Sequence, residues 1–481
     1  MKFRYDKDTE ELVVSEATRI EYHQLELNLT RKTKGWKFHP LVKAGIWDGN
    51  ISHFKNGRIN LGLWREAMMG CREVEAPFII ENKEDFPINR DVTLEKVQNF
   101  CKEFFKDHKV KTKDGWIPFT PYDHQIDAAF RILKNRYCMA EVATSGGKSL
   151  IISIVMFYTL KKIKSDAKFL IIVPSITLVT QFYDDLLKSY HGENNISRIS
   201  KIKIDDDIRV EEVMSDRPRK YSGTDNANVY IGTYQSLEKW PKEFFYQFHT
   251  IATDEAHGAK SKTITTILEH TFKRAYCRFG VSGTFPSEES CEILTIQSVL
   301  GPKITEVSAD ELKKKGIITP MDIKVVLMNH GDPHFYEQVK YIRKHGDGKA
   351  AFDFEKKYAH QSDKRLAFIS NLISKCTNNT LLLFHTIDNG QRIFNRLQSD
   401  IKDKEFFYID GEVSGKKREE IKKQMEITKK QVEYTILNFG DFEVDVKSDF
   451  QILLSNGKYK YAKEITPDDD IDDNFIEKLR K

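Results

Sequence analysis

A run of small residues followed by a lysine and a serine is the first segment that could do chemistry. Residues 143–149 read Ala-Thr-Ser-Gly-Gly-Lys-Ser, between apolar stretches at 137–142 and 150–160 that we interpret as a strand and a helix. Backbone N–H groups in such a loop can surround phosphate oxygens at the positive end of the helix. The residues expected to hold the nucleotide are Thr144, Ser145, Gly146, Gly147, Lys148 and Ser149.

Two side chains of this loop have separate expected roles. Lys148 would neutralise the β- and γ-phosphates of ATP, and the hydroxyl of Ser149 would hold Mg²⁺. The usual spacing of the motif also requires a glycine where Val142 stands. Taken alone, the loop could therefore also be a surface turn.

A pair of carboxylates supplies the second half of the chemistry. Asp254 and Glu255 open the sequence Asp-Glu-Ala-His and follow the apolar run 251–253, which we interpret as the end of a buried strand. We expect Asp254 to bind the Mg²⁺ shell and Glu255 to orient and deprotonate the attacking water. Ser-Gly-Thr follows at 282–284, in the order that an ATP-driven motor requires. The three segments together predict an ATP hydrolase that uses ATP and Mg²⁺.

Composition bounds the class of protein. At 481 residues the chain is too long for one core, so two to four domains are expected. With 40% hydrophobic and 31% charged residues it is typical of soluble globular proteins. No apolar stretch approaches the length of a membrane span, and residues 1–6 lack a signal-peptide core. We therefore expect a cytoplasmic location, which is the host cytoplasm if the chain is phage-encoded.

Charge and cysteine content narrow the possible partners. The net charge of +4, from 76 basic and 72 acidic residues, is too balanced to indicate nucleic-acid binding by itself, so any such surface must be a local patch. Six cysteines occur without a Cys-x-x-Cys pattern, which argues against structural zinc and against a disulfide framework.

Alternating apolar segments predict an α/β fold. Strand-like runs at 168–174, 228–233, 250–253 and 279–282 are separated by amphipathic helices, which is typical of a parallel sheet with crossover helices. A second alternating block predicts helix 364–374, strand 380–384, helix 389–397, strand 406–409 and helix 415–426. The expected domains are a small α+β domain at 1–90, a helical connector at 91–117, a first ATP-binding lobe at 118–305, a connector with a partial second lobe at 306–428, and a divergent β-hairpin with an acidic tail at 429–481.

The order of these motifs resembles that of superfamily-two helicases, and the amino-terminal segment is similar to the UvsW-like repair helicases of tailed phages. The resemblance covers about residues 1–427. It implies RecA-like parallel sheets with flanking helices, and an ATP-dependent DNA helicase or translocase acting on branched or forked DNA in phage recombination, replication and repair. It also implies that Gln125 reads the adenine, although local capping would explain the same residue.

The resemblance also assigns residues to coupling and to nucleic-acid contact. His257 would join Ser282, Gly283 and Thr284 in coupling hydrolysis to strand movement. The residues expected along the nucleic-acid backbone are Ser175, Thr177, Gln181, Thr233, Tyr234 and Gln235. Tyr234 and Gln235 could equally be ordinary residues at a strand end.

Two aromatic segments near the amino terminus look like the small DNA-binding domain of that family. They run from Trp36 to Pro40 and from Ile46 to Asn50, and Trp36, Lys37 and Trp47 are the expected contacts. Cations contact phosphates and aromatic rings stack on exposed bases. The basic residues interleaved with them are Arg31, Lys32, Lys34, Lys37, Lys43 and Arg58. Alternatively, Trp36, Phe38 and Trp47 form the core of the domain.

The second lobe departs from the family pattern. No Gln-x-x-Gly-Arg-x-x-Arg segment is present, and after Arg418 the sole arginine is Arg480. An arginine finger commonly contributes a factor of about 10³ to 10⁵ in rate, so we expect weakened hydrolysis. Residues 443–472 are weakly similar to strands of intein-type domains, which favours an interrupted lobe, but a divergent hairpin that closes the lobe fits as well.

Several partners and activities remain open at this point. DNA, branched or duplex, is the main expected partner, with RNA in R-loops and a second polypeptide that completes the carboxyl lobe as further candidates, and no membrane. The alternative functions are an ATP- and DNA-binding fragment with little hydrolysis, and an RNA-directed or restriction-type translocase.

Overall fold

The computed structural model divides into two compact units, Met1–Pro320 and Met321–Lys481, and each is described by itself. It describes residues 1–106, 109–112, 115–187, 209–214, 227–271, 275–318, 325–328, 332–346, 348–376, 380–384, 386–413, 417–418, 420–421, 424, 435–438, 453–454, 457–458 and 462–465. The predicted acidic run 468–473 lies outside these residues.

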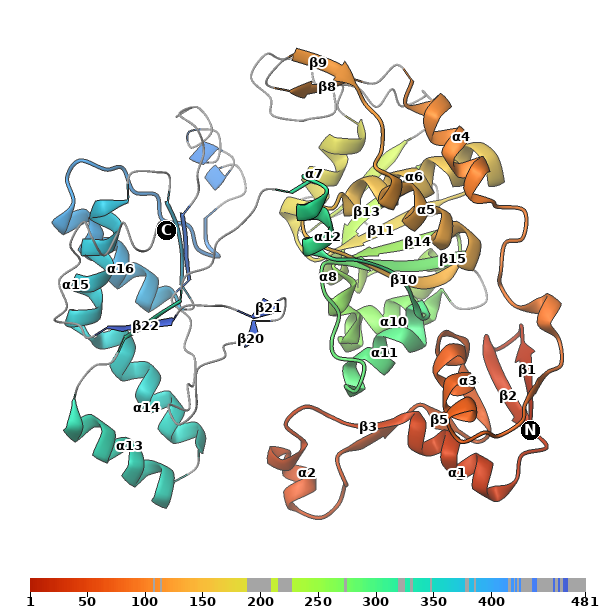
Figure 1. The fold of residues 1–481 in the computed structure, drawn as a ribbon, viewed down its shortest axis with the longest axis horizontal. Helices are drawn as coiled ribbons and strands as arrows, with labels where there is room; N and C mark the ends of the chain where they lie inside the picture. The colour runs from red at the N-terminus through yellow and green to blue at the C-terminus, as the bar shows by residue number, and fades with distance from the viewer. Residues whose placement is uncertain are drawn as a thin grey trace. The chain divides into compact units, whose positions relative to one another are not determined.

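A seven-stranded parallel sheet forms the centre of the first unit (Figure 1). Its strands are β10 Tyr137–Val142, β11 Phe169–Val173, β12 Val210–Val213, β13 Val229–Thr233, β14 Thr250–Asp254, β15 Cys277–Ser282 and β16 Lys303–Val307. They lie side by side in the order β12-β13-β11-β14-β15-β10-β16, and every neighbouring pair is parallel. The predicted parallel sheet is confirmed. Strands β12 and β16 were not predicted because they are edge strands that carry charged residues instead of a continuous apolar run.

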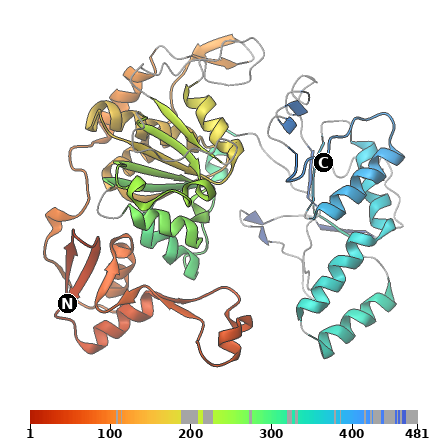
Figure 2. The same ribbon diagram turned by 180° about the vertical axis from the view of Figure 1, so that it is seen from behind.

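Helices cover both faces of this sheet, as the two opposite views show (Figures 1 and 2). The helices of the lobe are α5 Asp123–Asn135, α6 Lys148–Tyr158, α7 Ile176–Leu187, α8 Tyr234–Leu237, α9 Lys242–Phe245, α10 Lys262–His270, α11 Cys291–Leu300 and α12 Ala309–Lys314. Within the described part of the chain, none of the helices is long and apolar enough to pass through a membrane.

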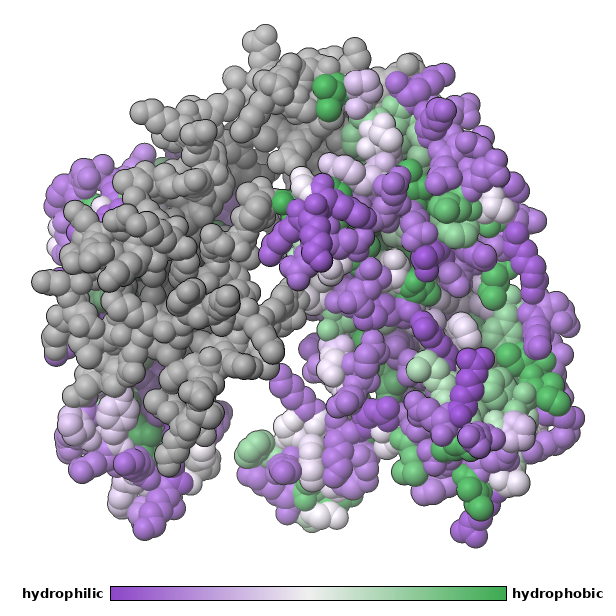
Figure 3. Space-filling model, in the orientation of Figure 1, coloured by the Kyte–Doolittle hydropathy of each residue, from purple (hydrophilic) through white to green (hydrophobic). Residues whose placement is uncertain are grey.

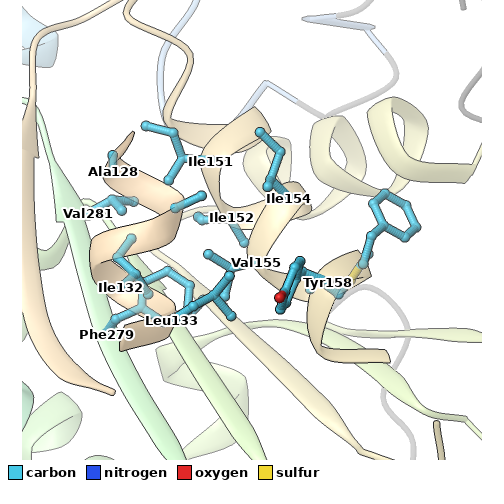
Figure 4. Packing of buried hydrophobic residues seen from close by; sticks show 14 of the residues in the cluster. Ala128, Ile132, Leu133, Ile151, Ile152, Ile154, Val155, Tyr158, Phe279 and Val281 are labelled. Atoms are coloured by element: carbon cyan, nitrogen blue, oxygen red, sulfur yellow. The ribbon is translucent and has the colours of Figure 1, made fainter. Parts of the chain in front are cut away.

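The core beneath α5 and α6 holds the start of α6 in place. Ile132 of α5 and Val155 of α6 are fully buried in the same cluster as Phe279 and Val281 of β15 (Figure 4). The opposite face of the sheet packs on α9, α10 and α11. A strand with both faces covered needs apolar residues throughout, which is why β11 reads Phe-Leu-Ile-Ile-Val.

The first part of the chain forms a small mixed sheet in the order β5-β6-β2-β1-β7. Its strands are β1 Lys2–Asp6, β2 Glu11–Ser15, β5 Phe54–Lys55, β6 Arg58–Asn60 and β7 Ile79–Ile80, packed with helices α1 Arg19–Asn28 and α3 Trp64–Glu73. Helix α4 Leu94–Phe104 and the hairpin of β8 Lys109–Thr112 and β9 Gly115–Pro118 follow. The predicted α+β character of this region is confirmed.

A buried ion pair joins the small sheet to the central one. The carboxylate of Glu10, in the turn after β1, accepts a hydrogen bond from Arg278 of β15 at 2.7 Å, and both side chains are less than 5% exposed. The Tyr137 hydroxyl lies 3.2 Å from the same carboxylate. A Cβ atom on Gly62 would lie 2.0 Å from the carbonyl oxygen of Gln297, so the chain there comes as close to α11 as glycine allows. The two layers therefore form one packed body.

The second unit contains helices and paired parallel strands. Its helices are α13 Pro333–His345, α14 Gly348–Gln361, α15 Asp363–Lys375 and α16 Ile387–Asp400. Strand β18 Thr380–Leu383 pairs in parallel with β19 Thr435–Asn438, and β17 Val325–Met328 pairs in parallel with β22 Ala462–Ile465. Strands β20 Leu453–Leu454 and β21 Gly457–Lys458 form the antiparallel pair expected of a hairpin.

One predicted strand of this unit is wrong. Residues 406–409 form no regular strand, although their composition is apolar. The ring of Tyr408 instead stacks on Phe384 at 5.4 Å, and its hydroxyl donates a hydrogen bond to the carbonyl oxygen of Ile387. Side-chain packing alone thus explains the apolar pattern there.

The buried pair between the two sheets leads to a stability prediction. Glu10→Gln leaves the Arg278 guanidinium buried without its counter-charge, so the free energy of unfolding should fall by about 3–5 kcal/mol. Glu11→Gln is the matched control, because its bridge to Arg58 is partly exposed and should contribute less than about 1 kcal/mol. Urea denaturation measures both, and equal losses in the two variants would contradict the assigned importance of the buried pair.

Candidate nucleotide-binding site

The loop between β10 and α6 has the backbone shape of an anion site. Gly146 donates its N–H to the carbonyl oxygen of Ala143 at 2.9 Å, and α6 begins at Lys148. Ser145 and Gly147 adopt the left-handed conformation, with φ of 66° and 87°. Left-handed residues alternating with others at a helix N-terminus are typical of concavities that bind phosphate.

Two side chains from the start of α5 contact the backbone of this loop through hydrogen bonds. Gln125 donates to the carbonyl oxygen of Gly146 at 3.0 Å, and Nε2 of His124 lies 2.9 Å from the same oxygen. Gln125 also accepts the backbone N–H of Tyr122 at 2.9 Å. Its amide is therefore engaged in the local capping that we considered as the alternative to adenine recognition. His124 was not among the predicted site residues, and its position directly before Gln125 was the available signal.

Lysine and carboxylate converge at the carboxyl edge of the sheet. Lys148 Nζ lies 3.3 Å from Oε1 of Glu255, and both side chains are mostly buried. Glu255 follows the last residue of β14 and has φ of 48°, a left-handed conformation that is strained for a residue with a side chain. Such strain persists where the surrounding structure fixes the residue, and at functional sites it turns a side chain in a required direction.

Asp254 is buried next to this pair with one oxygen unsatisfied. Its Oδ1 atom has no hydrogen-bond partner among the described residues. Burial, and then the neighbouring charge of Glu255, raise the pKa of Asp254 to about 6. A buried carboxylate oxygen without a donor suits a divalent cation, because Mg²⁺ takes oxygen ligands and would offset the charge.

The predicted coupling residues also gather here. His257 Nδ1 lies 2.9 Å from the Ser282 hydroxyl and 3.3 Å from Glu255 Oε2. Ser282 donates to the carbonyl oxygen of Thr284 at 2.8 Å. A Cβ atom on Gly283 would lie 3.6 Å from Lys148 Nζ and 3.4 Å from the Thr144 hydroxyl, so the end of β15 borders the phosphate loop.

Some of the residues expected to contact nucleic acid are exposed, and the others are used in contacts within the protein. Ser175, Thr177 and Gln181 are exposed, and the last two lie one turn apart on α7. Gln235 is exposed as well. The buried Thr233 hydroxyl instead accepts the Ser236 N–H and caps α8, and Tyr234 packs partly against the core.

Trp36, Lys37 and Trp47 lie in a separate part of the first unit. They belong to a segment between β3 Thr30–Lys32 and β4 Asn50–Ser52, which pair antiparallel. The buried core of the amino-terminal domain consists of other residues, including Phe3, Leu12 and Leu25. The alternative in which the two tryptophans and Phe38 form that core is therefore wrong.

The raised pKa of Asp254 predicts a pH-dependent stability difference. The folded chain holds this proton more tightly than the unfolded chain, so the contribution of the carboxyl to stability is complete below about pH 4 and is lost as the pH rises through about 6. Without Mg²⁺, the free energy of unfolding of Asp254→Asn should therefore be about 3 kcal/mol higher than that of wild type at pH 8, so the variant is the more stable protein there. The difference should shrink toward pH 4. Urea denaturation in EDTA measures it, with the exposed Asp166→Asn as control, and a pH-independent difference would contradict the prediction.

Known proteins are similar to this chain over the residues that carry the site. Residues 122–293 match the family model of the DEAD/DEAH box helicase. The ATP-dependent DNA helicase uvsW of Enterobacteria phage T4 is 27% identical over 445 residues, which cover 91% of this chain and 80% of that protein.

Solved structures share the fold. A crystal structure of the UvsW helicase from bacteriophage T4 is 23% identical, with a TM-score of 0.50 over 63% of this chain and 99% of that one. A second structure of T4 UvsW is 22% identical, with a TM-score of 0.51 over 92% of this chain and 80% of that one. The chain is a homologue of the UvsW helicase, and its residues 122–293 carry a DEAD/DEAH box helicase domain.

Proposed function

We propose that this protein is an ATP-dependent DNA helicase or translocase that acts on branched or forked DNA in phage recombination, replication and repair. The observation that carries the proposal is the 3.3 Å approach of Lys148 Nζ to Glu255 beside the buried Asp254. The likeness to uvsW, which is named an ATP-dependent DNA helicase, supports the activity. The preference for branched DNA, and RNA in R-loops as a second substrate, rest on family resemblance alone.

The ion pair at the site suggests how ATP acts on the resting protein. Lys148 and Glu255 form an ion pair and so neutralise each other. Phosphate oxygens of ATP would draw the ammonium of Lys148 away, since they carry more negative charge than one carboxylate. Glu255 is then available to orient a water molecule and accept its proton.

Asp254 and Ser149 are the residues that would hold Mg²⁺. The unsatisfied Oδ1 of Asp254 fits this role, and Ser149 stands in the first turn of α6. Mg²⁺ would polarise the phosphates and neutralise the charge that develops on them. Gln125 contributes by fixing the carbonyl group of Gly146, and through it the shape of the phosphate loop.

Coupling would run through the hydrogen bond between His257 and Ser282. Both residues contact Glu255, so the position of its carboxylate affects the end of β15. Nucleic acid would lie along the exposed residues Ser175, Thr177, Gln181 and Gln235, which follow the carboxyl ends of β11 and β13. Nucleotide-dependent changes at one edge of the sheet could thus reach the strand contacts at the same edge.

The proposal predicts loss of activity in two variants. Glu255→Gln should lower DNA-stimulated ATP hydrolysis by about 10²- to 10⁴-fold, because the general base is lost. Lys148→Ala should weaken ATP binding, and both should abolish unwinding of a forked duplex. The exposed Glu243→Gln and Lys239→Ala serve as matched controls. Unwinding by either site variant at the wild-type rate would refute the assignment.

A second candidate is an ATP- and DNA-binding protein with little hydrolysis. The absence of a Gln-x-x-Gly-Arg-x-x-Arg segment favours it. In that case the purified chain should bind ATP, show no more than a few-fold stimulation of turnover by DNA, and gain hydrolysis when a polypeptide with such a segment is added. Brisk turnover by the chain alone would exclude this candidate, and competition between forked DNA, duplex DNA and RNA would separate the DNA motor from an RNA-directed one.

A further inference from the structure

The segment between β3 and β4 forms a projecting arm, residues 30–52, with a fixed backbone. Thr33 donates its N–H to the carbonyl oxygen of Gly49, and both Ile46 and Trp47 donate to the carbonyl oxygen of Leu41. The arm carries the short helix α2 Pro40–Lys43 at the end distant from the small sheet (Figures 1 and 2). Its side chains are therefore presented on an ordered support.

Both tryptophans of the arm are used to build it. The Lys32 ammonium lies 3.5 Å above the Trp36 ring, and a Cβ atom on Gly49 would lie 2.7 Å from the Cβ of Trp36. Trp47 donates its indole N–H to the carbonyl oxygen of Asn50 and meets the His39 ring edge-on at 5.1 Å. Neither tryptophan is thus well placed to serve as an open platform for a base.

Other apolar side chains of the arm are exposed. Phe38 is 77% exposed and Ile46 is 73% exposed, and they flank α2 on either side in the sequence. Leu41 within α2 is 45% exposed. The space-filling view shows apolar residues among hydrophilic ones over this region (Figure 3). Exposing a phenylalanine and an isoleucine on a fixed support is costly unless a partner covers them.

The charge around these side chains identifies the partner. The arm carries five basic residues and one acidic residue, a net charge of +4 that equals the net charge of the whole chain. Arg31 is turned back onto the carbonyl oxygens at the end of α1, whereas Lys34, Lys37 and Lys43 are exposed and form no ion pair with any described residue. A nucleic acid with an accessible base pair is a polyanion that also offers apolar faces, and it fits both features of the arm.

We propose that Phe38 and Ile46 form a wedge that inserts at the terminal base pair of a duplex at a fork or branch and unstacks it, while the three lysines hold the adjoining phosphates. A continuous duplex offers phosphates but stacks its own bases, so only a junction engages both groups of residues. The inference deepens the proposed function, on which its choice of substrate rests.

The test uses 2-aminopurine, which fluoresces when it is unstacked, in the base pair next to the junction of a forked duplex. The full chain is added to saturation without nucleotide. Wild-type protein should raise the fluorescence several-fold, and Phe38→Ser combined with Ile46→Ser should remove most of that rise. The same variant should bind covalently closed circular duplex, which has no terminal base pair, with unchanged affinity. Ile20→Ser combined with Ile79→Ser is the matched control, because these exposed residues lie elsewhere in the same domain, and it should behave as wild type.

Two further variants separate the causes. Lys34→Ala, Lys37→Ala and Lys43→Ala together should weaken binding to both DNAs and lower the slope of log affinity against log salt by about 3. Lys148→Ala should keep the full fluorescence rise, because the experiment contains no nucleotide. The test of the wedge therefore does not depend on whether the proposed ATP site is correct. The wedge is overturned by the absence of a rise with wild type, by an equal rise with the Phe38 and Ile46 variant, or by loss of binding to closed circular duplex in that variant.

Discussion

The parallel pairing of β14 with β15, and of β15 with β10, is the constraint on which the rest of the site depends. Parallel strands place all their carboxyl ends at one edge, and the register sets Asp254 opposite Val281 and Ser282 opposite Glu141. The phosphate loop, the carboxylates and the serine that contacts His257 are far apart in the sequence. They meet because three neighbouring strands end together.

The same arrangement concentrates unfavourable electrostatics at the site. Two adjacent carboxylates stand at the end of a strand that is buried on both faces, and the second adopts a strained backbone conformation. The large apolar clusters on both faces of the sheet offset these costs. Lys148 pairs with Glu255, while burial, and then the charge of Glu255, raise the pKa of Asp254. Under the proposed function, a bound cation and phosphate would together offset these charges and stabilise the site.

The sequence predicted the central strands and placed the candidate site residues at their ends because both are marked by local patterns. Uninterrupted apolar runs identified β10, β11, β13, β14 and β15, and the phosphate loop and Asp254 lie directly after two of them. Edge strands β12 and β16 carry charged residues, and residues 406–409 imitate a strand because their apolar side chains pack without a backbone partner. Composition cannot distinguish those cases.

Side-chain roles were less predictable than backbone elements. Whether the Phe38 and Trp36 rings are exposed depends on which neighbour covers each of them. Lys32 covers the Trp36 ring, whereas Phe38 stays exposed. Thr233 looked available for nucleic acid but caps α8. The hydrogen bond of His124 to the phosphate loop depends on how α5 docks beside β10, which no local pattern encodes.

The ion pair between Glu10 and Arg278, together with the close approach of Gly62 to α11, has a mechanical consequence. Because these contacts join the small sheet to the ATP-binding sheet, we expect the two sheets to move together. If the ATP-binding sheet rotates, the amino-terminal domain that bears the arm would rotate with it, and the distant end of the arm would be displaced further than its base.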